Sequence, residues 1–270
     1  MTDSENSPPH HQPEEGKGLR GWIAGLLLAL SFLTRLPVPR WVHAGSAPLR
    51  IGPEALLLAG LLLGSLLALL AEGVLRFLPA FPPLLLALLL LFAWISLTGA
   101  LHLDGVADIV ECAYACVPPE EKRRIRKDPR KGVFGVLALI LFVLSKGAGL
   151  LLAHPLGLAL FLAPVIARSA LPAVAHLLVG LVGRSLPEPG ALGRILLEGG
   201  RVRPALVLLA GLLLSGLLAG GRGLAGAGAV VIGMAVLGRV HLGKVDGFSG
   251  DMAGFLVESG EILWLWALSL

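Results

Sequence analysis

The sequence is poor in charged residues, aromatic residues and cysteine. Asp, Glu, Lys and Arg make up 15% of the 270 residues, whereas soluble globular proteins carry about 25%. This scarcity argues against a soluble enzyme. The net charge of +4 does not indicate nucleic-acid binding, because Lys and Arg gather in the cytoplasmic loops of membrane proteins. The two cysteines, Cys112 and Cys116, favour reduced, inert thiols over a metal pair, since no further cysteine completes a zinc set.

Apolar residues, in contrast, make up 56% of the chain. Aromatics are few at 6% and glycines number 36, as expected where transmembrane helices pack closely through small residues. A spanning helix needs about 20 apolar residues. Six runs approach or exceed this length: 52–75, 84–101, 133–153, 156–182, 204–220 and 224–240. The sequence therefore predicts an all-α, polytopic integral membrane helical bundle with about six spanning helices.

The connections between these runs alternate in charge. The charged ones are 34–50, 102–132, 183–203 and 239–260, and the nearly uncharged ones are 76–83, 154–155 and 221–223. By the positive-inside rule, the charged connections lie in the cytoplasm.

Both ends of the chain differ from this pattern. Residues 1–18 are polar and are expected to be disordered, which leaves 19–270 as a single membrane-embedded catalytic domain. The apolar runs 21–33 and 262–270 are too short to span. We expect them to form short interfacial or re-entrant helices, with the C-terminal one half-buried.

Charge is concentrated in the stretch 98–135. Asp104, Asp108 and Glu111 are spaced i, i+4 and i+7, which places three carboxylates on one face of a helix. They would repel one another unless a cation neutralises them, and an all-oxygen set suits Mg²⁺, or Mn²⁺ in its place. A merely solvated face is the alternative, but the cluster directly follows a spanning run and has apolar neighbours.

A basic segment surrounds Asp128. Arg126, Lys127 and Arg130 flank this carboxylate just before the next apolar run. They could be a topology signal alone. We favour contact with substrate phosphates, because Mg²⁺ held by carboxylates together with phosphates is the usual arrangement for phosphoryl transfer.

Two further cations, Lys146 and Arg168, lie inside apolar runs. A charge inside a span is costly and is a functional hypothesis by default. Lys146 is expected to face the bundle interior. Arg168 lies between Pro164 and Pro172, which should kink or interrupt their run, and could reach a headgroup or a substrate phosphate. Pairing with a carboxylate for packing alone is an equally weighted alternative for both cations.

Two residues are candidates for proton transfer. Asp251 follows a Gly-Phe-Ser-Gly turn and could serve a metal or accept a proton. His102 precedes the carboxylate cluster and could act as a general base. A histidine that is simply hydrogen-bonded at the membrane boundary is the alternative for His102.

Three separate stretches resemble one family, cobalamin synthase, also called adenosylcobinamide-GDP ribazoletransferase. Residues 31–39, SFLTRLPVP, look like its N-terminal signature and contain Arg35. Residues 102–108, HLDGVAD, are similar to its HLDGLAD segment, and 125–135, IRKDPRKGVFG, resemble its I-M-K-D-S-R-x-G-x-F-G segment. Gly250-Asp251 with the acidic residues that follow looks like its C-terminal region. The chain differs at Glu111 and Cys112, where the family has Asp and Gly, and so resembles a somewhat divergent member.

The resemblance implies the nucleotide-loop assembly step of cobalamin biosynthesis in the bacterial cytoplasmic (inner) membrane, with the active site on the cytoplasmic side. An α-ribazole hydroxyl, or its 5′-phosphate, would attack the phosphorus attached to cobinamide in adenosylcobinamide-GDP and release GMP, with Mg²⁺ required. The lipid bilayer is the other partner, and the resemblance leaves room for a homo-oligomer.

Within this implied reaction, the candidate residues take definite roles. The expected metal ligands are Asp104, Asp108, Glu111 and Asp128. The expected substrate-binding cations are Arg35, Arg126, Lys127, Arg130, Lys146 and Arg168. The acceptor of the hydroxyl proton would be Asp251 or His102.

Two other classes of protein are alternatives to the cobalamin synthase interpretation. A membrane phosphotransferase acting on CDP-activated alcohols would also place aspartates and a divalent metal on spanning helices, but its D-x2-D-G-x2-A-R run is absent. A metal or solute transporter often has two related halves with broken spans near the midplane. Here the carboxylates cluster at one boundary and no half-repeat appears, which favours an enzyme.

Overall fold

The structure, a computed structural model, describes residues 23, 27, 30, 34, 37–40, 52–115, 117–118, 121, 131–182, 196–197, 200–245 and 247–270. The predicted tail 1–18, most of the run 21–33 and the site residues Arg35, Arg126, Lys127, Asp128 and Arg130 lie outside this part of the chain. The regular structure of the described residues is entirely helical. Its long elements are α3 (Pro53–Phe77), α4 (Pro83–Thr98), α5 (Leu101–Tyr114), α7 (Val133–Leu152), α8 (Leu156–Val182), α10 (Val202–Leu242) and α11 (Gly250–Ala267).

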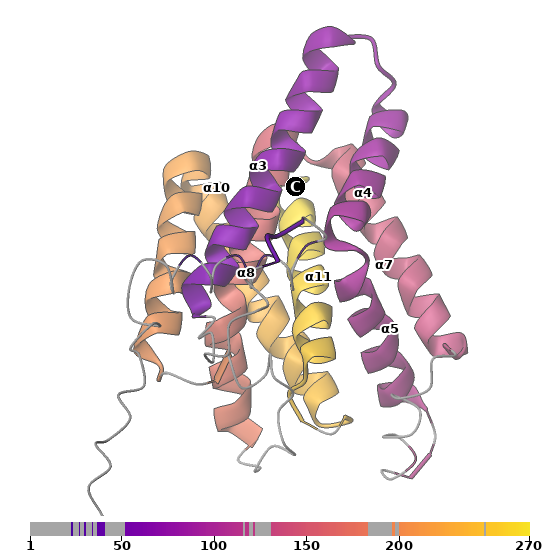
Figure 1. Cartoon of the computed structure of the whole chain (residues 1–270), viewed down its shortest axis with the longest axis vertical. Coiled ribbons are helices and arrows are strands. Elements are labelled where there is room, and N and C mark those ends of the chain that lie inside the picture. The colour runs from indigo at the N-terminus through magenta and orange to yellow at the C-terminus, as the bar shows by residue number, and fades with distance from the viewer. Residues whose placement is uncertain are drawn as a thin grey trace, which may run out of the picture.

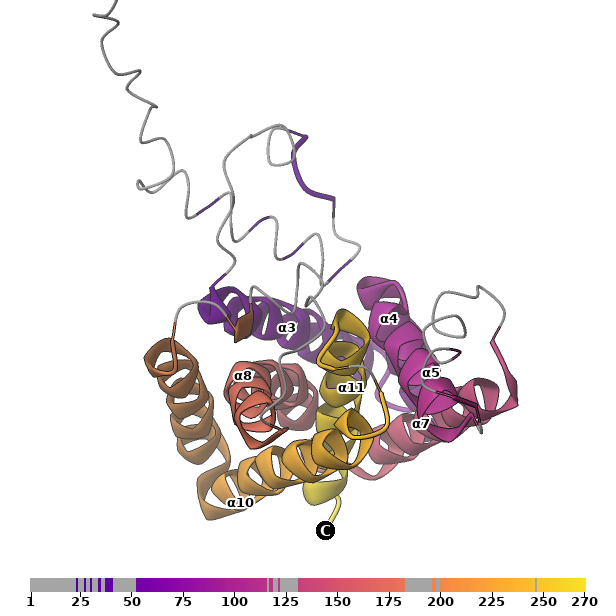
Figure 2. The same cartoon turned by 90° about the horizontal axis from the view of Figure 1, so that it is seen from below.

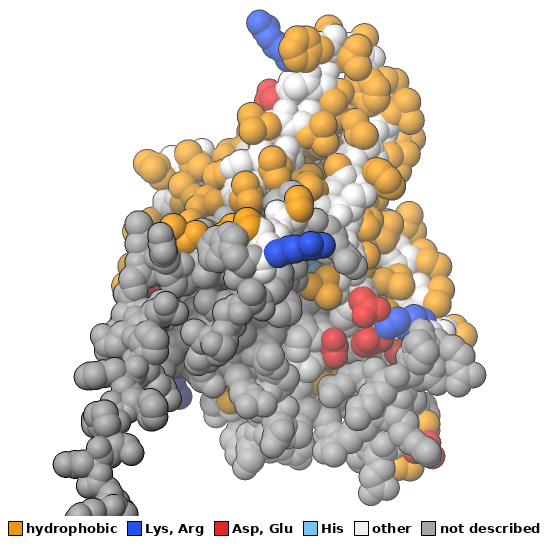
Figure 3. Space-filling view, viewed as in Figure 1, with side chains coloured by type: hydrophobic (Ala, Val, Ile, Leu, Met, Phe, Trp, Pro, Cys, Tyr) orange, Lys and Arg blue, Asp and Glu red, His pale blue; other side chains and the backbone are white. Residues whose placement is uncertain are grey.

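Four of these helices, α3, α7, α8 and α10, are long and apolar enough to cross a membrane, and α4 with α5 would make a fifth broken span. The prediction of an all-helical, multi-pass membrane protein is thereby confirmed. The exact number of spans, predicted as about six, stays a prediction. Figure 3 shows hydrophobic side chains over most of the upper part of the molecule, with basic and acidic side chains at its top edge and a group of acidic and basic side chains at the lower right. The exposed apolar residues include Leu69, Phe77, Phe92 and Leu217, which would face lipid.

The 41-residue helix α10 is longer than one span requires. A straight helix of that length would measure about 60 Å, roughly twice the thickness of the hydrocarbon core. Gly220 has φ 60° and ψ −146° and interrupts the helical geometry. Figure 2 shows that the two halves of α10 meet at an angle. This break falls next to the connection that the sequence predicted at 221–223.

A second break separates α4 from α5. Gly99 and Ala100 both have positive φ, at 61° and 58°, and the two helices are bent by 86°. Glycine adopts this left-handed region freely, and Gly99 closes α4 with its N–H on the carbonyls of Ile95 and Ser96. Helix α4 therefore ends at Thr98, three residues before the end of the predicted run 84–101. The bend brings the carboxylate-bearing helix α5 alongside α7 and α11 (Figure 1).

The centre of the bundle is formed by α8 and α11. Helix α8 continues through Pro164 and Pro172, so the prolines do not interrupt it. Figure 1 shows α11 between α8 and α5. The C-terminal element therefore differs from the expected short, half-buried helix: it has 18 residues, and Trp264 is fully buried. A short helix was expected because acidic residues precede Ile262 and interrupt the apolar run. Two of them, Glu258 and Glu261, are neutralised by cations inside the bundle.

The ends of the helices follow the predicted alternation. In Figure 1 the end of α5, the start of α7 and the start of α11 lie at the lower end of the molecule. The junctions of α3 with α4 and of α7 with α8 lie at the upper end. The end of α5, the start of α7 and the start of α11 therefore share one side of the bundle, and the side of the membrane that they face stays a prediction.

Candidate active site

The first half of α5 presents two carboxylates that meet at one cation. Asp104 and Asp108 are one helical turn apart, so their side chains share a face. The ammonium of Lys131, just before α7, lies 2.8 Å from Asp104 Oδ1 and also contacts Asp108 Oδ1. Partial burial alone would lower the pKa of Lys131, but the hydrogen bonds from its ammonium to the two aspartates raise it above the ordinary value. Lys131 is therefore a firm positive charge at this point.

Glu111, the third residue of the predicted carboxylate face, is directed to the start of α7. Its Oε2 accepts a hydrogen bond of 2.7 Å from the backbone N–H of Gly135. A Cβ on Gly132 would lie 2.2 Å from Glu111 Oε1, so the carboxylate occupies the space that a side chain there would fill. An anion at a helix N-terminus satisfies an otherwise unpaired N–H and complements the helix dipole. Glu111 thus holds the end of α5 to the beginning of α7.

Asp251 approaches α5 from the first turn of α11. A Cβ on Gly105 would lie 2.6 Å from the backbone oxygen of Asp251, so the absence of a side chain at Gly105 permits the close contact of the two helices. Ser249 caps α11 by accepting a hydrogen bond from the N–H of Met252. The predicted candidates Asp104 and Asp251 therefore come from different helices and reach the same region.

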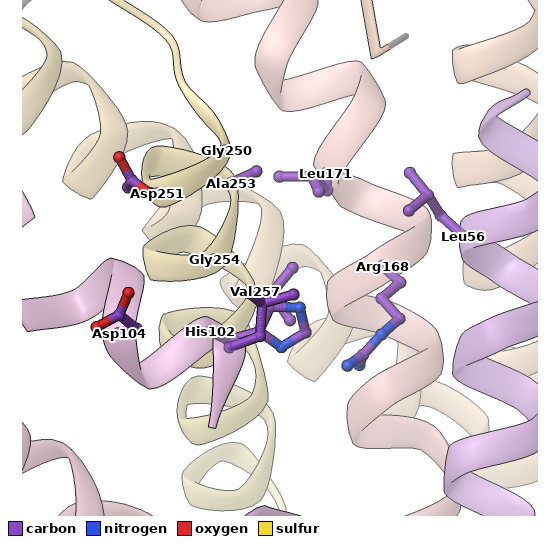
Figure 4. A pocket seen from close by; sticks show the side chains of 11 residues that line it. Leu56, His102, Asp104, Arg168, Leu171, Gly250, Asp251, Ala253, Gly254 and Val257 are labelled. Atoms are coloured by element: carbon purple, nitrogen blue, oxygen red, sulfur yellow. The ribbon is translucent and has the colours of Figure 1, made fainter. Parts of the chain in front are cut away.

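A cavity of about 190 Å³ opens beside these two aspartates. Its lining is mainly apolar and consists of Leu56, Leu101, His102, Asp104, Arg168, Leu171, Gly250, Asp251, Ala253, Gly254 and Val257. Figure 4 shows Asp104 and Asp251 on one side, and the side chains of His102 and Arg168 directed toward each other on the other. The cavity therefore joins an acidic end to a deeper end with two nitrogen-bearing side chains.

Two polar atoms at the deeper end have no hydrogen-bond partner among the described residues. They are Nδ1 of His102 and Nη2 of Arg168. The two residues are only 4% and 1% exposed, and an unsatisfied buried polar atom costs about 1–3 kcal/mol. Such atoms at the wall of a cavity are suited to a ligand that hydrogen-bonds with them.

A buried cluster of four charges lies behind the cavity. The ammonium of Lys146 on α7 is 2.7 Å from Glu258 Oε2 and 2.5 Å from Glu261 Oε2 on α11. Nη1 of Arg168 on α8 is 2.6 Å from Glu261 Oε1. Lys146 faces the bundle interior as predicted, and two cations balance two anions. The pairing with carboxylates, weighed above as one alternative for Lys146 and Arg168, is present in the structure.

The chemistry of the acidic end is compatible with a hard divalent cation. Asp104 and Asp108 already place oxygens around one positive charge, and carboxylate oxygens are the ligands that Mg²⁺ prefers. Within the described ranges, however, no group of three or more His, Cys, Asp or Glu side chains is close enough to hold an ion. Two of the expected ligands, Asp104 and Asp108, therefore fit a metal site together. Glu111 is engaged with α7, and Asp128 falls outside the described ranges.

The sequence analysis did not identify two features of this region. Lys131 was absent from the candidate residues, although its place directly before Gly132 and the next apolar run was a usable signal. Glu258 and Glu261 were noted as acidic but were given no partners. Their partners lie 93 to 115 residues away along the chain, and no local pattern predicts such a pairing.

Comparisons with known proteins cover nearly the whole chain. The family model described as cobalamin-5-phosphate synthase matches residues 25–269. Proteins named adenosylcobinamide-GDP ribazoletransferase from Pseudomonas paraeruginosa and Pseudomonas aeruginosa are 38% and 37% identical, with 93% of this chain and 100% of each relative aligned. The protein of that name from Stutzerimonas stutzeri is 36% identical over 91% of this chain and 97% of its own length. No solved structure matches.

Proposed function

The chain belongs to the cobalamin-5-phosphate synthase family, and we propose that it catalyses the Mg²⁺-dependent assembly of the nucleotide loop of cobalamin. It transfers the adenosylcobinamide phosphate group of adenosylcobinamide-GDP to α-ribazole, or to α-ribazole 5′-phosphate. GMP is released, and adenosylcobalamin or its 5′-phosphate is formed. The reaction takes place on the cytoplasmic side of a bacterial inner membrane.

The observation that carries this proposal is the meeting of Asp104, Asp108 and Lys131 at the mouth of a cavity that Asp251 also lines. Phosphoryl transfer needs little covalent chemistry from the protein and depends on positioning and on stabilisation of charge. A site with two carboxylates and one ammonium on rigid helix ends supplies both.

The transfer balances as a displacement at one phosphorus. A hydroxyl oxygen of α-ribazole forms the new bond to the phosphorus that carries cobinamide. The bond from that phosphorus to the bridging oxygen of the diphosphate breaks, and GMP leaves with the electron pair. The hydroxyl proton passes to a carboxylate, for which Asp251 is the best-placed candidate because it lies at the cavity mouth on a different helix from the metal ligands.

The remaining residues bind and orient the substrates. Asp104 and Asp108 would hold Mg²⁺, which when bound neutralises phosphate oxygens and makes the phosphorus more electrophilic. Lys131 would add a fixed positive charge for the phosphate oxygens of the substrate. We assign the cations Arg35, Arg126, Lys127 and Arg130 to the leaving GMP, and Asp128 to the metal, from the sequence resemblance.

Release of GMP tests this proposal. Purified full-length protein in lipid nanodiscs is incubated with adenosylcobinamide-GDP and α-ribazole, with Mg²⁺ or with a chelator, and GMP is measured by chromatography. We expect GMP and a cobalamin product in equal amounts, only when both substrates and Mg²⁺ are present. GMP release without α-ribazole would indicate hydrolysis. Absence of GMP under all conditions would refute the proposed activity.

A further inference from the structure

The cavity beside Asp104 and Asp251 is distinct in character from the carboxylate cluster at its mouth. Most of its wall is apolar, and its only cation, among the described residues, is Arg168. Nη1 of Arg168 is already paired with Glu261, and Lys146 and Glu258 complete a neutral set of four charges. No excess positive charge is therefore left at this depth to offset a phosphate, and a neutral ligand is the better match.

The volume limits the ligand further. A closed apolar cavity of roughly 150 Å³ binds benzene, and the sites of whole drug-sized ligands measure about 300–1,000 Å³. A cavity of about 190 Å³ therefore suits a small, flat ring system and is far too small for a corrin macrocycle. Leu171 and Val257 supply apolar surface to contact such a ring.

The two unpartnered nitrogens define the polar part of the ligand. Nη2 of Arg168 is a donor only, so it requires an acceptor such as a ring nitrogen. Nδ1 of His102 can donate or accept, depending on the tautomer. A ligand with one ring-nitrogen acceptor and a nearby hydroxyl would satisfy both atoms and leave few polar groups of its own unpaired.

We propose that this cavity binds the aromatic base of the nucleoside acceptor, a benzimidazole-type ring whose free nitrogen accepts a hydrogen bond from Nη2 of Arg168. This inference rests on the proposed function, which supplies α-ribazole as the acceptor. The attached ribose then points to the mouth of the cavity, where its hydroxyl meets Asp251 and the carboxylates of α5. Arg168 is on this account a specificity-determining residue for the base.

Guanine, the other base in the reaction, fits this cavity less well. Its ring N–H and its exocyclic amino group are donors that need acceptors. The carboxylate acceptors of the lining, Asp104 and Asp251, lie at the mouth, so at the deeper end Nδ1 of His102 can accept from only one of these donors. Each buried donor left unpaired costs about 1–3 kcal/mol. A benzimidazole ring carries only one unsubstituted nitrogen once the sugar is attached. The chemistry of the wall therefore discriminates between the two bases.

Direct binding of benzimidazole and of α-ribazole to the full-length protein in nanodiscs tests the inference. Arg168→Lys keeps a positive charge for Glu261 but removes the second N–H group of the fork. Leu171→Phe adds bulk to the cavity wall about one turn further along α8, without changing the charge cluster. Each variant should weaken the binding of both probes by about tenfold, as expected for the loss of one hydrogen bond or of a matching shape. Binding of adenosylcobinamide-GDP should change by less than about twofold.

The control is Arg203→Lys, which alters an exposed pair with Glu54 on the surface and should leave all three affinities unchanged. If Arg168→Lys fails to fold, Leu171→Phe decides the matter alone. Weaker binding of adenosylcobinamide-GDP with unchanged binding of α-ribazole would overturn the inference and assign the cavity to guanine. No binding of either probe to the unaltered protein would overturn it as well. Binding of the probes without release of GMP would instead refute the proposed reaction and leave the base-binding cavity in place.

Discussion

Single side chains on α5 serve different purposes although they share a helix face. Asp104 and Asp108 meet Lys131 at the mouth of the cavity, whereas Glu111, one turn further along, caps α7. The sequence spacing predicted one cluster because it contains no information on where the next helix begins. The chain differs from the resembled family at Glu111. The glutamate side chain is longer than the aspartate of the family, and its carboxylate reaches the backbone N–H of Gly135 on α7.

Replacement of Glu111 separates capping from metal binding. Glu111→Ala removes the acceptor for the N–H of Gly135 and should lower the free energy of unfolding by about 1 kcal/mol, as for the loss of other N-terminal caps. Glu111→Gln keeps an acceptor oxygen and should be destabilised less. Unfolding of the detergent-solubilised protein in increasing denaturant measures both variants.

Glu121→Ala, which removes an exposed carboxylate from a neighbouring connection, is the control. A Glu111→Ala variant that is no less stable than this control would contradict the capping role. A Glu111→Gln variant that is stable but inactive would show that the charge also serves the reaction.

At the scale of helices, the crossing of α5 and α11 sets the position of the site. Gly105 lies against the backbone of Asp251, and a Cβ on Gly254 would lie 3.1 Å from Cα of His102. The two glycines allow both backbones to approach, which brings His102, Asp104 and Asp251 to one cavity. The HLDG segment therefore contains a packing residue next to its chemical ones.

Gly105→Ala should disturb this crossing. Its Cβ would meet a backbone oxygen at 2.6 Å, so α11 must shift. We expect a loss of about 1–3 kcal/mol in the free energy of unfolding, as for other overpacked positions, and a fall in the rate of GMP release. Gly147→Ala on α7 is the matched control, because the nearest atom to its Cβ is a side-chain carbon at 3.6 Å. Equal stability and activity of the two variants would disprove the crossing as a constraint.

The helices themselves were largely predictable from the sequence. Apolar runs gave the bounds of α3, α7 and α8 to within a few residues, because a helix in lipid must satisfy its own backbone and therefore continues for as long as the side chains are apolar. Helix α11 was predicted only in part, since Asp251, Glu258 and Glu261 interrupt its apolar pattern. Their burial depends on cations from α7 and α8, which become neighbours only in the folded bundle.

In the molecule as a whole, charge is placed in two sets with different functions. The set of Lys146, Arg168, Glu258 and Glu261 is buried and balanced, and it joins α7, α8 and α11. The set of Asp104, Asp108 and Lys131 is partly exposed at the junction of α5 with α7. The sequence analysis singled out Asp104, Asp108, Lys146 and Arg168 but not Lys131. It could not assign their partners, because residues remote in the chain decide which charges are neutralised internally and which remain for a substrate.

The most direct test of the account is the rate of GMP release by Asp104→Asn. This change preserves the size of the side chain but removes its negative charge. The rate should fall by about 100-fold or more, as for the loss of other groups that stabilise charge at a reacting centre, while gel filtration and thermal unfolding match those of the unaltered protein. Glu54→Gln, which removes an exposed carboxylate from the start of α3, should retain the full rate. An Asp104→Asn variant that releases GMP as fast as the unaltered protein would contradict the assignment of the α5 carboxylates to the reaction.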